Sequence, residues 1–328
     1  MRTNNISLSE TSEQRLAHLL QIDSSNIVEV LRNRLAYVTF SVPKKHGGHR
    51  IIESPHPQLK QIQTAIHKYL LDKMTFSDSV HGFVLRKNIL SNANVHIGRN
   101  YVFNLDLQNF FPSISDHQVY EEFWRFPFGG EPVLCELLTR LCTFKGHLPQ
   151  GAPTSPIISN MVCRNLDNEL EEFTDSVEMR YSRYADDITL SSYQLPPSQV
   201  VTFERKIPRV GAGLRCIIEE NGFRVNDKKV RLQPKYRRQE VTGIIVNTRP
   251  NVPREYLNQI RAMLHSLKLD GETGAAIKHF RNQPNLDLEA LPSFTAILRG
   301  KIDYVGFVRG REDRIYLRLL DDFIACAN

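Results

Sequence analysis

The sequence predicts an α+β protein with a βαββαβ-like sheet and helices on one face of that sheet. A strand-like apolar run at residues 101–105 precedes helical patterns near 116–124 and after Ser155-Pro156. Tyr184-Ala185-Asp186-Asp187 then lies between runs rich in β-branched and aromatic residues, which is typical of a hairpin. A helical region and a strand at 223–226 complete the order of a sheet of this kind.

A small mixed lobe is expected before this sheet. Leucines near residues 16–20, and apolar residues after the polar cluster 23–26, predict two short helices. Strand-like runs at 37–42 and 49–53 flank a turn at 43–48 that contains two glycines, so they predict a hairpin. An amphipathic helix should follow, with its apolar stripe formed by Leu59, Ile62, Ile66 and Leu70.

The later part of the chain predicts a broken helix and then a basic helical lobe. Prolines and glycines within 195–222 should break or kink the helix there. Pro253 can begin a helix whose apolar stripe is formed by Leu257, Ile260, Leu264 and Leu267. Residues 300–304 (Gly-Lys-Ile-Asp-Tyr) are either a turn that faces nucleic acid or a junction between helices.

Composition narrows the class of protein. With 328 residues, 41% of them hydrophobic, the chain can bury a core of two or three lobes. A net charge of +6 and six basic residues within 228–238 suggest contact with a phosphate backbone, although a solvated basic loop would look the same. Five cysteines without metal-site spacing, and no apolar run of about 20 residues, favour a reduced cytosolic protein rather than a membrane or secreted one.

Three acidic residues indicate a metal site. Asp186 and Asp187 are adjacent, and neighbouring carboxylates resist ionising together unless cations lie against them. Asp106 ends the strand-like run 80 residues earlier (186 minus 106), where an unpaired carboxylate would be costly. Hard divalent cations with oxygen ligands suit such a cluster. The alternative is a capping aspartate together with an unrelated turn.

Five ordered motifs make the chain resemble reverse transcriptases. They are residues 106–114 (Asp-Leu-Gln-Asn-Phe-Phe-Pro-Ser-Ile), 148–156 (Leu-Pro-Gln-Gly-Ala-Pro-Thr-Ser-Pro), 184–187 (Tyr-Ala-Asp-Asp), 222–229 and 241–243 (Val-Thr-Gly). Residues 92–96 (Asn-Ala-Asn-Val-His) and 241–243 further resemble two motifs of the bacterial retron type, which that family associates with recognition of its own structured RNA.

The resemblance implies a right-hand polymerase fold with fingers, a ferredoxin-like palm and a helical thumb. Residues 1–100 would hold the N-terminal helices and fingers, 101–247 the palm with part of the fingers around 127–150, and 248–328 the thumb. It also implies two Mg²⁺ ions held by Asp106, Asp186 and Asp187, with Leu107 in the same ligand set. Lys229 matches a lysine that can protonate pyrophosphate, or else it is a phosphate-facing or solvated lysine.

The same resemblance assigns residues to nucleotide and RNA binding. Phe111 would exclude a 2′-hydroxyl, unless it is simply a core residue, and glycine at 151 would let the chain approach the incoming nucleotide. The expected nucleotide-binding residues are Lys44, Lys45, Arg50, Phe111, Gln150 and Gly151. The expected RNA-binding residues are Asn92, Ala93, His96, Arg237, Arg238, Val241, Thr242, Gly243, Arg254 and Arg261. For residues 241–243 a strand end without RNA contact is the alternative.

The implied activity is RNA-templated DNA synthesis in the bacterial cytoplasm. A cognate structured noncoding RNA would serve as template and primer, deoxynucleotides as substrates, and an RNA–DNA hybrid carrying multicopy single-stranded DNA as product. A role in antiphage defence with a separate effector protein is also implied. The alternatives are a reverse transcriptase of another bacterial defence class or a group II intron, and an RNA-binding scaffold that sequesters an effector.

Overall fold

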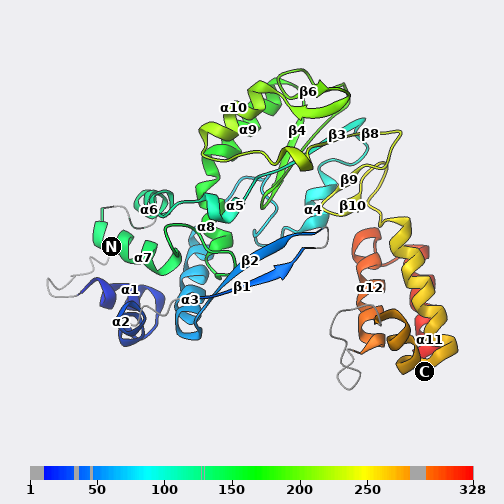
Figure 1. The fold of residues 1–328 in the computed structure, drawn as a ribbon, viewed down its shortest axis with the longest axis horizontal. Helices are drawn as coiled ribbons and strands as arrows, with labels where there is room; N and C mark the ends of the chain where they lie inside the picture. Colours follow the sequence, from blue (N-terminus) through cyan, green and yellow to red (C-terminus); the bar gives the residue numbers. More distant parts are fainter. Residues whose placement is uncertain are drawn as a thin grey trace, which may run out of the picture. The chain divides into compact units, whose positions relative to one another are not determined.

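The chain forms two compact units (Figure 1). The computed structural model describes residues 11–32, 37–44, 47–126, 128, 130–280 and 293–327. Unit 1 consists of Met1–Asn88 and Phe103–Leu232, and unit 2 consists of Ile89–Val102 and Gln233–Asn328. The three-part division expected from the sequence has its boundaries at 100 and 247 and stays a prediction.

Unit 1 begins with the small mixed lobe that the sequence predicts. Its elements are α1 (Ser12–Leu20), α2 (Ser24–Arg32), β1 (Tyr37–Pro43), β2 (His49–Pro55) and α3 (Pro57–Lys73). Thr11 and Gln14 form a reciprocal capping box that fixes the start of α1. The four apolar residues predicted to line α3 are all buried. The two helices, the hairpin and the amphipathic helix are therefore confirmed.

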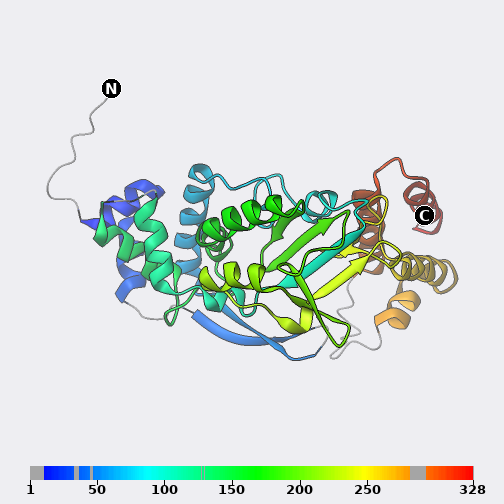
Figure 2. The same ribbon diagram turned by 90° about the horizontal axis from the view of Figure 1, so that it is seen from above.

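The central sheet of the molecule has the predicted βαββαβ order. Strands β3 (Tyr101–Asp106), β4 (Arg180–Tyr184), β5 (Asp187–Ser192) and β8 (Arg231–Pro234) are hydrogen-bonded in the order β4-β5-β3-β8. Between β3 and β4 lie α5 (Phe110–Ser113), α6 (Asp116–Arg125), α7 (Pro132–Cys142), α8 (Ser155–Val162) and α9 (Arg164–Ser176). Helix α9 contacts β4 and lies beside α10 (Ala212–Glu220), as Figure 2 shows.

Two predicted elements of unit 1 are wrong. Residues 195–222 contain a hairpin of β6 (Val201–Glu204) and β7 (Ile207–Val210) before α10, rather than one broken helix. β-Branched and aromatic residues favour those strands, and a sheet of two edge strands tolerates Pro208. Residues 223–226 form only an isolated bridge between Val225 and Leu107, and the fourth strand of the sheet is β8.

Unit 2 combines a short helix and a small hairpin with three longer helices. These are α4 (Ile89–Asn94), β9 (Glu240–Val241), β10 (Ile244–Ile245), α11 (Arg254–Phe280), α12 (Phe294–Arg309) and α13 (Arg314–Ala327). The predicted apolar stripe of α11 is buried, and Gly271, at φ 65°, kinks that helix. Residues 300–304 lie inside α12, so neither expectation for them, a turn or a helix junction, is correct.

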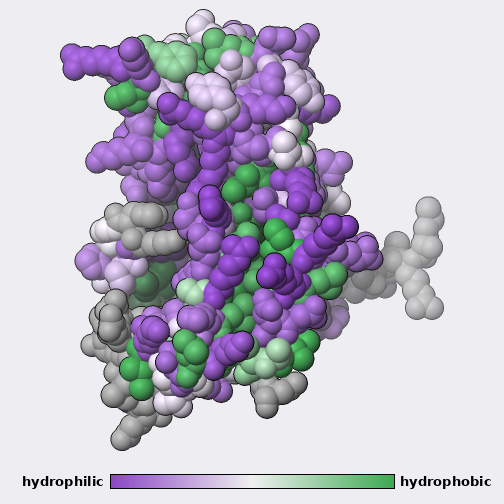
Figure 3. Space-filling view, turned by 90° about the vertical axis from the view of Figure 1, so that its right-hand side faces the viewer, coloured by the Kyte–Doolittle hydropathy of each residue, from purple (hydrophilic) through white to green (hydrophobic). Residues whose placement is uncertain are grey.

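The helices of unit 2 keep some apolar side chains exposed. These are Leu269, Ile277, Phe307, Leu317 and Ile324. Figure 3 looks from the side of these helices and shows apolar side chains, in green, between polar ones. Within the described residues, no helix has both the length and the apolar character needed to cross a bilayer.

Candidate active site

Asp106 is a buried carboxylate at the end of β3, and both of its oxygens have partners. The residue is 5% exposed. Asn226 Nδ2 donates to Asp106 Oδ1 at 3.1 Å, and the backbone N–H of Asn226 donates to the Asp106 carbonyl at 2.8 Å. Lys229 Nζ lies 2.5 Å from Asp106 Oδ2. These charge-assisted contacts make an ionised carboxylate tolerable at this depth.

Asp186 lies on the tight turn between β4 and β5, and Asp187 is the first residue of β5. Tyr184 and Asp187 are paired across the hairpin, and Ala185 has a φ of 57°, which is rare for a residue with a Cβ. The backbone N–H of Leu107 donates to the Asp186 carbonyl at 2.9 Å. This bond ties the turn to the residue that follows Asp106, so the fold joins acids that lie 80 positions apart in the sequence.

The three acids influence one another electrostatically. Desolvation and the negative charge of Asp106 raise the pKa of Asp186, although Lys229 and Arg50 oppose this. Desolvation and the charges of Asp186 and Asp106 raise the pKa of Asp187 to about 6. Carboxylates that disfavour one another's ionisation in this way have an unmet need for positive charge.

The donor atoms at this site suit Mg²⁺. Hard cations prefer carboxylate and carbonyl oxygens, which Asp106, Asp186, Asp187 and the Leu107 backbone can supply. Among the residues that the structure describes, no three acidic, histidine or cysteine side chains are already gathered in a metal-ligand geometry. The Lys229 ammonium instead neutralises one side of Asp106. The residues therefore fit Mg²⁺ in chemistry and charge.

Arg50 is the member of the predicted nucleotide-binding set that most clearly belongs to this site. It lies on β2 opposite Val42, and its positive charge lowers the pKa of Asp186. The β1–β2 hairpin therefore carries a side chain that interacts electrostatically with the acids. Lys44 follows β1 and is exposed. Lys45 lies outside the described residues, so its predicted role is not addressed by the structure.

The predicted loop residues Gln150 and Gly151 pack directly against the same hairpin. The Gln150 carbonyl accepts from the Glu53 N–H at 2.9 Å. Gly151 has a φ of 138°, and a Cβ there would lie 2.8 Å from the Glu53 carbonyl oxygen. His147 Nε2 lies 3.0 Å from Glu53 Oε2, which adds a side-chain contact. The hairpin that carries Arg50 and this loop are thus one assembly.

Phe110 and Phe111 have different environments on α5. Phe110 is buried, as the sequence suggested, and its ring stacks 5.7 Å from that of Phe223. Phe111 is only partly buried, and its ring lies 5.3 Å from Phe110 and 6.3 Å from Phe83. Part of the Phe111 ring is therefore accessible to a bound nucleotide, and its role in excluding ribonucleotides stays a prediction.

The two retron-like motifs come together within unit 2. Asn92 Nδ2 lies 3.5 Å from Thr242 Oγ1, and Thr242 Oγ1 donates to the Ile89 carbonyl at 3.2 Å. Four of the predicted RNA-binding residues are fully buried, namely Asn92, Ala93, His96 and Val241. Their side chains have no exposed surface with which to touch RNA in this structure. For Val241, at the end of β9, burial favours the strand-end alternative, and the contact of Asn92 with Thr242 indicates that Asn92 holds the turn of the β9–β10 hairpin against α4.

The remaining predicted RNA-binding residues are better placed for direct contact. Thr242 is partly exposed, and the others are exposed, namely Gly243, Arg237, Arg238, Arg254 and Arg261. Arg238 already pairs with Glu240 and Glu255, at 2.7 and 3.2 Å. Exposed guanidinium groups suit phosphate oxygens, so the direct RNA contact is expected from these arginines.

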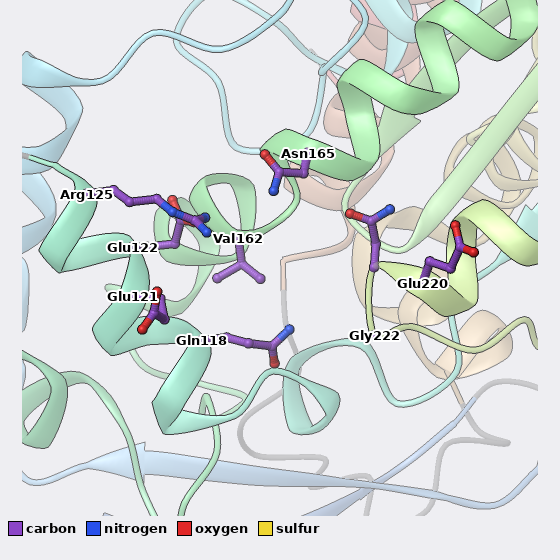
Figure 4. Close-up of a pocket in the computed structure, with 9 residues that line it drawn as sticks. Gln118, Glu121, Glu122, Arg125, Val162, Asn165, Glu220 and Gly222 are labelled. Carbon is purple, nitrogen blue, oxygen red and sulfur yellow. The ribbon is translucent and has the colours of Figure 1, made fainter.

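A separate cavity of about 270 Å³ lies elsewhere in unit 1 (Figure 4). It is lined by Gln118, Glu121, Glu122, Arg125, Val162, Asn165, Glu220, Asn221 and Gly222. Glu122 is paired with Arg125 at 2.6 Å. None of the predicted site residues lines this cavity, so it is distinct from the acidic site.

Two neighbours of the acids were not expected from the sequence. Asn226 holds Asp106, and Arg183 contacts the Ala185 carbonyl just before Asp186. The only sequence signal for Arg183 is a basic residue inside the strand-like run before the Tyr-Ala-Asp-Asp motif. Nothing in that run distinguishes it from the exposed Arg180.

Known proteins match this chain over more than half of its length. Residues 42–246 match the family described as reverse transcriptase (RNA-dependent DNA polymerase). The retron Ec86 reverse transcriptase of Escherichia coli is 33% identical over 234 residues, which cover 70% of this chain and 70% of that protein. Retron Mx162 and Mx65 reverse transcriptases of Myxococcus xanthus are 33% and 36% identical over 71% and 70% of this chain. The matches cover 53% and 55% of the length of those two proteins.

Proposed function

Because the chain belongs to the reverse transcriptase family, the RNA-dependent DNA polymerases, and to its bacterial retron type, we propose that it makes multicopy single-stranded DNA on a cognate structured noncoding RNA. The observation that carries this proposal is the joining of the Asp186 turn to the end of β3, where Lys229 pairs with Asp106. In this proposal the central sheet is the palm, the β1–β2 hairpin belongs to the fingers, and α11–α13 form the thumb.

The reaction joins a primer hydroxyl to the α-phosphorus of a deoxynucleoside triphosphate. A new P–O bond forms, the α–β phosphoanhydride bond breaks, pyrophosphate leaves, and the hydroxyl loses its proton. Asp106 and Asp186 would hold two Mg²⁺ ions, with Asp187 and the Leu107 backbone in support. When bound, Mg²⁺ supplies positive charge at the attacking and leaving oxygens.

Side chains around the acids would select and orient the nucleotide. Arg50 would offer a guanidinium fork to the triphosphate, and Lys44 and Lys45 would add positive charge. Phe111 would lie under the sugar, while Gln150 and Gly151 would border the base and ribose. The Lys229 ammonium, which pairs with Asp106, would neutralise charge on departing pyrophosphate or give it a proton.

The RNA partner would be recognised mainly by unit 2 and would act as both template and primer. The exposed arginines of that unit fit phosphate oxygens, and the buried Asn92–Thr242 junction would fix the turn that presents Gly243. The product would be an RNA–DNA hybrid in the bacterial cytoplasm. A separate effector protein would couple this product to antiphage defence.

Nucleic acid that co-purifies with the protein tests the retron assignment. The bound material is treated with RNase and then separated on a denaturing gel. A branched RNA–DNA hybrid, which leaves DNA joined to a short RNA remnant, is the expected result. RNA without attached DNA would instead support the RNA-binding scaffold.

The substitution Asp186→Asn tests the acidic site itself. Removing this charge should lower primer extension about a thousandfold or more, because metal-assisted phosphoryl transfer depends on several kcal/mol of charge stabilisation. Binding of the cognate RNA should persist. Asp175→Asn, at an exposed position on α9, is the matched control and should retain activity. Polymerisation by Asp186→Asn at the wild-type rate would remove the metal-ligand assignment.

A further inference from the structure

Arg183 is a fully buried arginine that lies three residues before Asp186. It is 0% exposed, and it is the largest fully buried side chain among the described residues. Burying a guanidinium group costs several kcal/mol unless its charge and its donors are satisfied. An arginine at this position on β4 therefore has to have well-ordered partners.

The main partner of Arg183 is Asp167 on α9. Arg183 Nε and Nη2 donate to Asp167 Oδ1 and Oδ2, each at 2.7 Å, which is the bidentate fork geometry. Tyr181 Oη donates to Asp167 Oδ1 at 2.6 Å. With two fork bonds and the tyrosine bond, the guanidinium plane is fixed between the sheet and α9.

The remaining arm of Arg183 reaches the catalytic turn. Arg183 Nη1 lies 3.2 Å from the Ala185 carbonyl oxygen and 3.1 Å from Asn160 Oδ1. Ala185 is the residue with a φ of 57°, a conformation that costs about 1 kcal/mol for a residue with a Cβ. The bond to Arg183 holds the peptide group between residues 185 and 186, and the Leu107 N–H holds the next carbonyl, that of Asp186.

A neighbouring segment closes around the same turn. Asn160 Nδ2 donates to the Gly82 carbonyl at 2.9 Å. A Cβ on Gly82 would lie 2.5 Å from the Ala185 nitrogen, so only glycine permits this approach. The backbone of Arg183 also bonds to Ser79 and His81. The turn is thus enclosed on the side of α8 and α9.

We propose that Arg183 is a positioning residue for DNA synthesis, which uses its fork on Asp167 to hold the Ala185 carbonyl and so to aim the Asp186 carboxylate at the Asp106 side of the site. This inference rests on the proposed role of Asp186. A displacement of about 1 Å in a reacting geometry can cost a hundredfold in rate, so the effect should appear in kcat. A pair that only stabilised the core would not alter kcat at temperatures where the protein is folded.

The test compares three variants in primer extension well below their unfolding temperatures. Arg183→Met combined with Asp167→Leu removes the hold on Ala185 but leaves no unpaired buried charge, a replacement that folds often tolerate. Arg183→Lys keeps the charge without the fork. Tyr181→Phe is the matched control, because it removes a bond to Asp167 from the same network and leaves the contact with Ala185.

We expect kcat to fall about tenfold to a hundredfold in the double variant and in Arg183→Lys, with the Mg²⁺ concentration for half-maximal activity increased. KM for template–primer should be unchanged, and Tyr181→Phe should resemble wild type. A kcat within twofold of wild type in the folded double variant would overturn the proposal. If the double variant does not fold, equal kcat for Arg183→Lys and Tyr181→Phe would overturn it.

Hydrogen exchange gives a readout that does not depend on activity. The Leu107 amide, which bonds to the Asp186 carbonyl, should exchange faster in Arg183→Lys than in Tyr181→Phe. Equal protection in the two variants would overturn the positioning role. If wild-type protein makes no DNA on any primer–template, the proposed function fails, and the exchange result still decides whether Arg183 holds the turn.

Discussion

Asp187 is exposed to solvent, and its pKa is raised to about 6. The folded protein then binds this proton more tightly than the unfolded chain does, so ionisation of Asp187 costs stability as pH rises from about 4 to about 6. In protein without metal, Asp187→Asn should therefore raise the free energy of unfolding at pH 7.5 by about 1 kcal/mol, a value reduced for solvent screening. The gain should vanish at pH 4, as urea titrations at the two pH values would show.

With Mg²⁺ present, wild-type protein should instead be more stable than Asp187→Asn. Added Mg²⁺ stabilises the folded state in proportion to its affinity, and the wild-type carboxylate binds it better than an amide does. Thermal unfolding at pH 7.5 with and without Mg²⁺ measures this difference. Wild-type protein that is insensitive to Mg²⁺ would contradict the cation site, whereas an unchanged pH dependence in Asp187→Asn would contradict only the raised pKa.

Phe111 is the residue whose size should determine sugar selectivity. Replacing it with valine would remove the bulk expected to collide with a 2′-hydroxyl, so ribonucleotide incorporation should increase about tenfold or more relative to deoxynucleotide incorporation. Single-nucleotide extension with matched dGTP and GTP measures the ratio. Phe83→Leu is the control, because the Phe83 ring packs 6.3 Å from Phe111 without being part of the proposed gate. Equal selectivity in Phe111→Val and wild type would leave Phe111 as a packing residue.

At the scale of single residues the sequence predicts residues that carry motifs and misses those that act through a neighbour. Asp106, Asp186 and Asp187 could be found because adjacent carboxylates and a buried acid are hard to explain without a cation. The Arg183–Asp167 pair could not, because α9 has five acidic residues and the sequence does not show which one turns inward. The position of Asn92 likewise depends on its contact with Thr242, 150 residues later.

The packing of the β1–β2 hairpin on the loop that contains Gln150 makes Gly151 a sensitive position. Gly151→Ala should lower the free energy of unfolding by about 2–3 kcal/mol and raise KM for the incoming nucleotide, because the added methyl group meets the Glu53 carbonyl and alanine is strained at this φ. Urea titration and steady-state extension measure the two effects.

Gly146→Ala is the matched control for that prediction. Gly146 also has a positive φ, 79°, but the nearest heavy atom to an added Cβ is 3.9 Å away, so only the backbone strain applies. It should cost about 1 kcal/mol and leave KM for nucleotide unchanged. Equal effects of the two substitutions on KM would contradict a specific contact between the loop and the hairpin.

Elements with clear periodicity could be predicted, whereas the β6–β7 hairpin and the strand β8 could not. The stripe on α11 and the four apolar residues of α3 are buried as their spacing requires. The β6–β7 hairpin was missed because its turn residues, Arg205 and Lys206, adopt positive φ values without a glycine to mark them. The last strand of the sheet was expected at residues 223–226. Only two backbone hydrogen bonds join that segment to residues 106 and 108, and the sheet instead pairs β3 with β8.

At the scale of the whole molecule, the division into units does not follow the order of the sequence. The core of unit 2 takes Ala93 and Val102 from one segment and pairs them with residues from 241 onward. The sequence suggested a boundary near 100, because the strand-like run beginning at 101 looks like the start of a new part. Composition and motifs cannot show that residues 89–102 belong with a segment that begins at 233.

Because unit 2 is made of two separate segments, its parts are synthesised at different times. A ribosome makes residues 89–102 first and then all of 103–232 before any of the chain that completes the same core emerges. During that interval the nascent chain must keep Ala93 and Val102 from other apolar partners, while the rest of unit 1 is already able to form. Release of the chain at residue 232 would therefore leave an apolar segment stranded between the two halves of unit 1, a species that chaperones and proteases would recognise.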